Sequence, residues 1–149
     1  MKKLVYMALM SLTLVSCAAI KQQQNIATIM ETHTIQAPAS AVYTAAVEEF
    51  KGMFVPLTAN GKNKGATAWY TKHTSLGDKP YMEKDRFVVV VKSNGKNKSK
   101  VVVTRELQSN FTGSWSHKPT ARMHIYEFNI QKRLDPSVAK QIEDKASKM

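Results

Sequence analysis

The sequence predicts an α+β protein, in which an antiparallel β-meander carries one helix after its first strand and a C-terminal helix packed on the sheet. Three observations support this prediction. The segment 39–53 repeats apolar residues every three or four positions, as an amphipathic helix does. Several later segments are rich in valine or alternate apolar with polar residues, which favours strands. From Asp135 onward the chain again carries helix-start chemistry.

Residues 1–17 have the composition of an export signal. Two lysines are followed by an apolar run, 4–15, that ends at Ser16 and Cys17. This run is shorter than the roughly 20 residues that a membrane-spanning helix needs, so a permanent span is not expected. The ending Leu14-Val15-Ser16-Cys17 resembles the lipobox of bacterial lipoprotein precursors. The alternatives are a chance cysteine after a hydrophobic segment, or an uncleaved anchor.

The lipobox resemblance implies that residues 1–16 are a signal peptide and that Cys17 receives fatty-acyl chains such as palmitate. Two or three chains hold a protein on a bilayer essentially permanently, because each buried methylene contributes ~0.8 kcal/mol. Cys17 is then an anchor and neither a catalyst nor a metal ligand. Residue 18 is alanine and not aspartate, which in the enterobacterial sorting pattern implies the outer membrane, facing the periplasm. Residues 17–27 are predicted to be the lipidated cysteine with a tether, and 28–149 a single domain.

The charge and the cysteine content limit the partners and the source of stability. The whole chain has a formal net charge of +11, and Cys17 is its only cysteine. No internal disulfide can form, so stability must come from packing. In a cytosolic protein this charge would suggest nucleic acid, but export makes nucleic acid an unexpected partner. Phospholipid headgroups, lipopolysaccharide phosphates, acidic cell-wall groups and acidic proteins remain; the alternative is a merely soluble, lysine-rich surface.

The first elements after the tether are a strand and a helix. Residues 29–36 alternate well enough to predict a strand. Pro38 then marks the start of the helix 39–53, and Gly52 is placed to end it.

A meander is predicted next. Extended runs at 53–58 and 66–74 flank the pair Asn60-Gly61, which is a strong hairpin signal. The segment 75–84 is predicted to be a loop.

The clearest hairpin joins residues 86–92 and 100–104, because runs of β-branched valine suit a pleated surface. A polar loop, 109–119, follows. Residues 124–131 alternate almost without a break, which predicts a last strand with His124, Tyr126, Phe128 and Ile130 facing the core. Asp135-Pro136 then supplies an N-cap residue and a first-turn proline for the C-terminal helix.

This order of elements resembles the helix-grip arrangement. The segment 35–50 is also similar to the opening of such domains in small envelope lipoproteins. The resemblance implies a fold and no activity, because that group offers no catalytic motif to carry over.

The sequence shows no pattern typical of an enzyme, a metal site or a cofactor site. Zinc sites need three or four convergent ligands, and the histidines are scattered over predicted strands and loops, at positions His33, His73, His117 and His124. There is no Gly-x-Ser-x-Gly nucleophile motif. Glu48 and Glu49 are adjacent and diverge by about 100° on a helix, so they do not form a carboxylate pair. We therefore expect a non-catalytic protein without cofactor or metal.

A five-residue repeat places lysines at two predicted hairpin tips. The sequence Asn-Gly-Lys-Asn-Lys occurs at 60–64 and again at 94–98. If both turns emerge at one end of the sheet, they build a basic patch for anionic headgroups or an acidic partner, with Lys62, Lys64, Lys96, Lys98 and Lys100 as its residues. The alternative is that Asn-Gly forms the turns and the lysines keep the strand edges soluble and unpaired.

Trp115 lies in a loop, 111–117, that is apolar for a solvent-exposed segment. It is predicted either to fill the gap between helix and sheet or, with His124, to line a groove for a ligand or peptide. On apolar faces, His33 and His124 are more often hydrogen-bonded core histidines than ligands.

Three functions remain open. The leading hypothesis is a membrane-anchored bacterial envelope lipoprotein that acts as a non-catalytic interaction or assembly module with an envelope protein partner. The second is a carrier of a small ligand or lipid, held in a cavity between helix and sheet. The third is contact with a membrane surface through the lysine tips.

Overall fold

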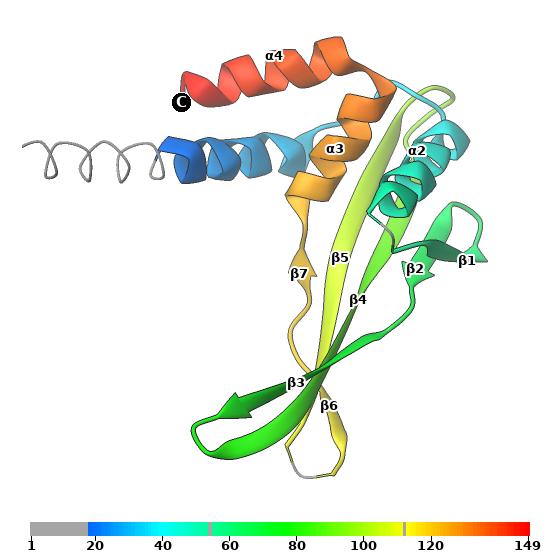
Figure 1. Ribbon diagram of the computed structural model, residues 1–149. Helices are drawn as coiled ribbons and strands as arrows, with labels where there is room; N and C mark the ends of the chain where they lie inside the picture. Colours follow the sequence, from blue (N-terminus) through cyan, green and yellow to red (C-terminus); the bar gives the residue numbers. More distant parts are fainter. Residues whose placement is uncertain (1–17, 54, 112) are drawn as a thin grey trace, which may run out of the picture.

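Seven antiparallel strands and the helices beside them form the structure, a computed structural model that describes residues 18–53, 55–111 and 113–149. The strands are β1 (Leu57–Gly61), β2 (Lys64–Thr67), β3 (Tyr70–Leu76), β4 (Lys79–Ser93), β5 (Ser99–Asn110), β6 (Trp115–His117) and β7 (Ala121–Arg122). The named helices are α2 (Ala39–Gly52), α3 (His124–Leu134) and α4 (Pro136–Ser147). The predicted α+β class with an antiparallel sheet is confirmed (Figure 1).

The long hairpin of β4 and β5 is the frame of the sheet. Its pairing runs from Ser93 opposite Ser99 to Met82 opposite Asn110. The free edge of β4 pairs with β2 near the hairpin turn and with β3 farther away, while β5 pairs with β7 and then β6. The predicted valine hairpin is therefore confirmed, with strands longer than expected.

The loop prediction for residues 75–84 is wrong. Only Gly77 and Asp78 form a turn, and the flanking residues belong to β3 and β4. The residues next to this turn show no regular apolar alternation, so sequence period did not reveal these parts of β3 and β4. They are held by backbone pairing and by cross-strand ion pairs such as Lys72 Nζ to Glu83 Oε2 at 3.1 Å.

The helix α2 forms as predicted, directly after Pro38. It packs on the valines of β4 and β5, and its buried apolar residues include Val42, Ala46 and Phe50. The first core lies between this helix, the sheet and Ile130 of α3. Side chains of this core occupy the interface between α2 and the sheet.

The N-terminal part of the domain differs from its prediction. Residues 18–32 form one helix, so the predictions of a tether at 18–27 and of a strand at 29–36 are both wrong. Of the residues predicted to form this strand, Ile35 makes a single antiparallel β-bridge, to Ser99. The helix forms because Ile26 and Met30, four residues apart, share one face and are buried against other helices.

The strand predicted at 124–131 is also wrong, because these residues form α3. Its inner face has helical spacing and includes Tyr126, Glu127, Ile130 and Gln131, two of which are polar. Because two of the inward-facing residues are polar, the apolar residues alone do not show a helical period. Phe128, which lies on another face of the helix, gives the sequence an apparent alternation of apolar and polar residues.

The C-terminal helix α4 begins where the sequence predicts. The Asp135 carboxylate accepts hydrogen bonds from the backbone N–H groups of Ser137 at 3.0 Å and Val138 at 3.1 Å, and Pro136 takes the first position. The helical C-terminal region packs on the sheet through α3, which contacts β5, and α4 lies against α3.

A second core joins the helix of residues 18–32 to α3 and α4 (Figure 1). Its buried members are Ile26, Met30, Phe128, Ala139, Ile142 and Ala146. Both cores lie within residues 26–146, so a chain that begins at residue 18 contains them complete. None of the described helices has the length and apolar character needed to cross a bilayer.

Candidate interaction surfaces

The two lysine-bearing turns lie beside each other at one end of the sheet. The first joins β1 to β2 and the second joins β4 to β5, and the Val91 N–H donates to the Asn63 carbonyl at 2.9 Å. The predicted juxtaposition of the two repeats is therefore present. The side chains of Lys62, Lys64, Lys96 and Lys98 are all exposed.

Local hydrogen bonds hold both turns in place. Tyr43 on α2 donates its hydroxyl to the Lys64 carbonyl at 3.1 Å, and it crosses Gly65 so closely that a Cβ there would lie 2.5 Å from the hydroxyl oxygen. Asn63 has a φ of 56°, a left-handed conformation that asparagine tolerates. In the second turn the Asn94 N–H donates to the Lys98 carbonyl at 2.7 Å.

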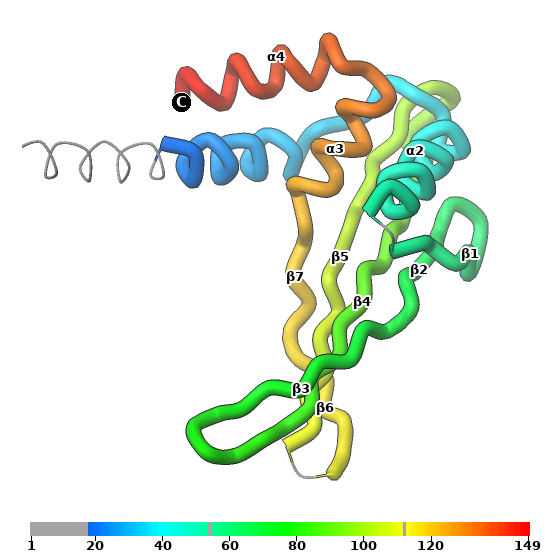
Figure 2. Tube along the Cα trace, viewed as in Figure 1, coloured from blue at the N-terminus to red at the C-terminus, as the bar shows by residue number. Residues whose placement is uncertain are grey.

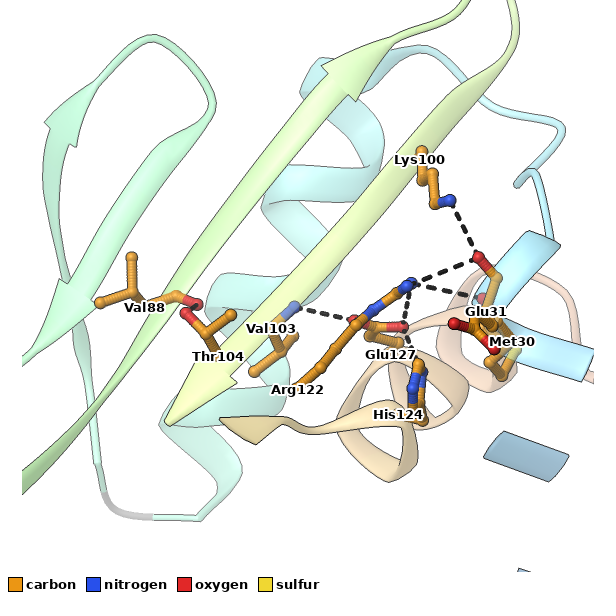
Figure 3. Close-up of polar contacts among 9 residues, drawn as sticks. All are labelled: Met30, Glu31, Val88, Lys100, Val103, Thr104, Arg122, His124 and Glu127. Atoms are coloured by element: carbon orange, nitrogen blue, oxygen red, sulfur yellow. Dashed lines mark hydrogen bonds and ion pairs between the residues drawn. The ribbon is translucent and has the colours of Figure 1, made fainter. Parts of the chain in front are cut away.

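Lys100 has a different role from the other predicted lysines. It is half-buried, and its Nζ donates to the Glu31 carbonyl at 2.9 Å, near the C-terminal end of the helix 18–32 (Figure 3). A cation suits this position because the last carbonyls of a helix lack intrahelical partners. Lys92, directly opposite Lys100 on β4, is exposed and extends the basic surface in place of Lys100.

The far half of the sheet projects beyond the helices (Figure 2). We call this part the distal arm and define it as β3, residues 79–86 of β4, residues 105–111 and β6. The predicted polar loop at 109–119 is partly strand here, since Trp115 pairs with Asn110. Large apolar side chains are exposed along the arm, at Tyr70 (67%), Leu76 (69%), Phe111 (48%) and Trp115 (38%).

Cations contact aromatic rings on the arm and at Trp69, the residue just before it. Lys84 Nζ lies 4.3 Å from the ring centre of Trp115 and 5.0 Å from that of Trp69, and the Arg86 guanidinium carbon lies 4.5 Å from Trp69. The rings of Tyr81 and Phe111 stack with their centres 4.1 Å apart. Cation–π contacts and stacking hold these side chains in place although they are partly open to solvent.

A groove of about 440 Å³ adjoins the arm where the chain passes from β2 to β3. Its walls are mainly apolar and include Val55, Pro56, Trp69 and Phe87. The groove opens here because the pairing of β2 with β4 ends at Ala66 opposite Val88. The next N–H on this side of β4, that of Phe87, donates to the Thr67 hydroxyl at 3.0 Å. Sequence reasoning missed this site, since a break in strand pairing leaves no periodic signal.

The structure does not bring Trp115 and His124 together. Trp115 lies on β6 of the arm, whereas His124 is the first residue of α3. The pairing of β7 with Thr104 and of β6 with Asn110 separates them along β5. Neither side chain is part of the groove at Trp69.

His124 belongs to a buried ionic cluster around Glu127 (Figure 3). The Glu127 side chain is fully buried, and its carboxylate accepts bonds from Arg122 Nε and Nη2, both at 2.9 Å. It also accepts the Val103 N–H at 3.0 Å, and His124 Nδ1 lies 3.2 Å from Oε2. The Glu127 carboxylate therefore accepts the backbone N–H of β5 that a carbonyl of a neighbouring strand would otherwise accept.

The same arginine reaches the N-terminal helix. Arg122 Nη2 lies 3.4 Å from the Met30 carbonyl oxygen, and Nη1 lies 3.5 Å from that of Glu31. Through these contacts the Glu127 cluster ties α3, β5 and the helix 18–32 together. Its geometry is that of a structural junction.

Three further findings bear on function. Among the described residues, no group of three or more His, Cys, Asp or Glu side chains is placed to hold a metal ion. Cys17 lies outside the described residues. Comparison of the chain with protein-family models, with curated proteins and with solved structures gives no match.

Proposed function

We propose that this chain is a lipoprotein of the bacterial cell envelope, anchored through Cys17 to the outer membrane on its periplasmic side, and that its domain is a non-catalytic interaction or assembly module. The lipobox-like ending Leu14-Val15-Ser16-Cys17 supports the anchor. The helix 18–32 follows directly and docks on the domain through Ile26 and Met30. An anchored domain of this kind would be held near the bilayer in a restricted orientation.

The observation that supports the interaction role is the exposed apolar surface of the distal arm. Exposed Tyr70, Leu76, Phe111 and Trp115 lie on a sheet whose far half no described helix covers. Aromatic side chains are enriched in protein interfaces, and clustered exposed apolar residues mark contact sites. The cation–π contacts at Lys84 reduce the side-chain freedom that binding would otherwise remove.

Cross-linking in cells, followed by purification of the full chain, tests whether this protein has an envelope partner. We expect one envelope protein to be recovered in stoichiometric amount. The variant Tyr70→Ser, Leu76→Ser, Phe111→Ser should lose it, because these side chains would form the centre of the contact. Ile125→Ser, which changes an apolar residue that is 40% exposed on α3, is the matched control and should retain it. A protein that remains solitary in every condition contradicts the interaction role.

The anchor is tested separately by mass analysis of the native product. A chain that begins at Cys17 and carries diacylglyceryl and acyl groups is expected, and Cys17→Ala should leave the membrane fraction. An unmodified thiol with residues 1–16 still attached contradicts the anchor.

A second function, the binding of a small apolar ligand, is favoured by the groove beside Trp69. Its volume of about 440 Å³ and its walls of Val55, Pro56 and Phe87 suit an acyl chain or a similar ligand. This site replaces the expected cavity between α2 and the sheet, which the first core occupies. Native mass spectrometry of the delipidated protein tests it: a co-purifying ligand that is lost in Ala68→Trp supports a carrier, and apo protein that binds no added fatty acid contradicts one.

A further inference from the structure

The three stretches of chain that build the end with the two lysine turns contain no acidic residue. Three stretches of chain meet there, 32–47, 57–67 and 87–104, and none of them contains Asp or Glu. The α2 helix also starts at this end, and its first turn lacks an acidic residue. We define the exposed side chains Lys62, Lys64, Lys92, Lys96 and Lys98 as the lysine end. None of these five lysines takes part in a salt bridge among the described residues, so their charges add to a positive surface.

The placement of these lysines lowers the stability of the folded protein. Lys92 and Lys100 are directly opposite each other on β4 and β5, and like charges at such positions repel. Lys64 is opposite Val90, so its side chain leaves the same face of the sheet as that of Lys92. Lysines that served only to protect a strand edge would not need to gather on one face.

The chemistry of the lysine end favours a diffuse anionic surface over a protein partner. Protein interfaces are enriched in aromatic residues and arginine and depleted in lysine. The lysine end has the opposite composition, since residues 60–64 and 93–98 contain only Asn, Gly, Ser and Lys. Lysine acts as a compact point charge that suits phosphate groups without a fixed geometry. Both turns are also tips of hairpins, so they present convex surfaces without a groove.

We propose that the lysine end docks on the anionic headgroups of a lipid bilayer. The inference deepens the proposed function, because it names a second membrane contact for an anchored chain. The helix 18–32 would span about 22 Å at 1.5 Å per residue, and Lys100 contacts the carbonyl of Glu31 near its far end. Residue 18 and Lys100 are thus about one helix length apart, and Lys100 lies opposite Lys92 of the lysine end, so an anchor before residue 18 and the lysine end would reach one bilayer if the helix lay along it.

Sedimentation with vesicles tests this contact. The protein is the chain 18–149, which contains both cores and lacks Cys17. Vesicles of phosphatidylglycerol and phosphatidylethanolamine should bind it, vesicles of phosphatidylcholine alone should not, and salt should weaken binding because exposed charges are screened. The variant K62Q/K64Q/K96Q/K98Q should lower the partition coefficient by at least about 100-fold, from about fivefold per lysine near an anionic surface.

A matched variant, K79Q/K140Q/K145Q/K148Q, removes the same charge from exposed positions at the start of β4, on α4 and directly after α4. It should lower binding much less. Equal losses in both variants would show a net-charge effect and overturn the proposal, as would binding that ignores lipid charge. If the same four lysines bound poly-glutamate more tightly than vesicles, the partner of the lysine end would be an acidic protein. That result would also overturn the proposal. Because this chain has no Cys17, a failure of the lipid anchor leaves the result unaffected.

Discussion

Glu127 is the residue at which three parts of the protein meet. Its carboxylate binds Arg122 through two nitrogens and accepts the Val103 N–H, and the same arginine approaches the Met30 carbonyl. A buried charge is tolerable only when it is paired and fully hydrogen-bonded. Among the described residues, every buried side-chain nitrogen and oxygen has a hydrogen-bond partner.

Glu127→Gln should therefore be strongly destabilising. The amide retains the shape but removes the negative charge, so Arg122 keeps a positive charge without its counterion. We expect a loss of about 3 kcal/mol in the free energy of unfolding, measured by urea denaturation. Glu143→Gln, which breaks the exposed pair with Lys132, should cost less than about 1 kcal/mol. Similar losses for both variants would contradict the role of Glu127 as a junction.

Asp135 makes part of the stability depend on pH. Hydrogen bonds from the Ser137 hydroxyl and then from the Val138 N–H lower the pKa of its carboxyl below the ordinary value. Since the folded-state pKa is the lower one, the stabilisation is present above the ordinary aspartate pKa of about 3.9 and is lost as pH falls through the folded value.

Two variants of Asp135 separate the charge from the cap. Asp135→Ala should lower Tm near neutral pH, and this deficit should shrink in acid as the wild-type carboxyl protonates. Asp135→Asn keeps an N-cap residue that does not titrate, so its Tm should lie between the other two near neutral pH. Thermal unfolding followed by circular dichroism measures both. A deficit for Asp135→Ala that stays constant with pH contradicts the lowered pKa.

At the scale of elements, α3 is a helix that is buried on more than one side. Ile130 belongs to the first core and Phe128 to the second, so the helix connects the sheet with the helices 18–32 and α4. Arg133 on α3 also pairs with Glu49 of α2, and Asn129 Nδ2 donates to the same carboxylate at 3.0 Å. The helix 18–32 depends on this support, because short helices are marginal alone in water.

Met30→Ala should weaken the docking of the helix 18–32. Met30 is 2% exposed, and truncation of a buried methionine costs about 2–5 kcal/mol through lost burial and the cavity that remains. We expect a lower free energy of unfolding and faster proteolysis within 18–32. Gln23→Ala, at an exposed position of the same helix, should change neither. Unchanged proteolysis in Met30→Ala would mean that the second core does not hold this helix.

At the scale of the whole molecule, the sheet has two halves of different character. Near the lysine end, α2 and α3 cover Val89, Val91, Val101 and Val103. In the distal arm the strands are held by cross-strand pairs, such as Arg86 Nε to Glu106 Oε2 at 2.7 Å, and by aromatic contacts. Surface ion pairs contribute little, so the arm depends on its continuity with the rest of the sheet.

Hydrogen exchange should reveal this difference. Amides of β3 and β6 should exchange faster than those of the paired valine segments, because opening the arm exposes few buried apolar groups. Deuterium exchange followed by mass spectrometry, peptide by peptide, measures it. Protection that is uniform along β4, from Lys79 to Ser93, would contradict two halves of unequal stability.

Local signals were sufficient wherever neighbouring residues decide the conformation. The stripe of α2, the valine hairpin, the Asn-Gly turns and the Asp135-Pro136 cap were all predictable, because each depends on contacts within a few residues. The basic residues of the lysine end were predictable for the same reason, with the exception of Lys92 in place of Lys100. The lipid anchor and the partner stay predictions.

Tertiary structure alone decided the states of 18–32 and 124–131. Both segments carry patterns that are compatible with an extended chain, and each became a helix because a second core, built from residues more than 90 positions apart, buries one side of it. Glu127 and Gln131 could face inward only because Arg122, Val103 and His33 satisfy them from other elements. The distal arm and its groove likewise depend on where strand pairing stops, which is set by distant backbone partners and leaves no mark on local periodicity.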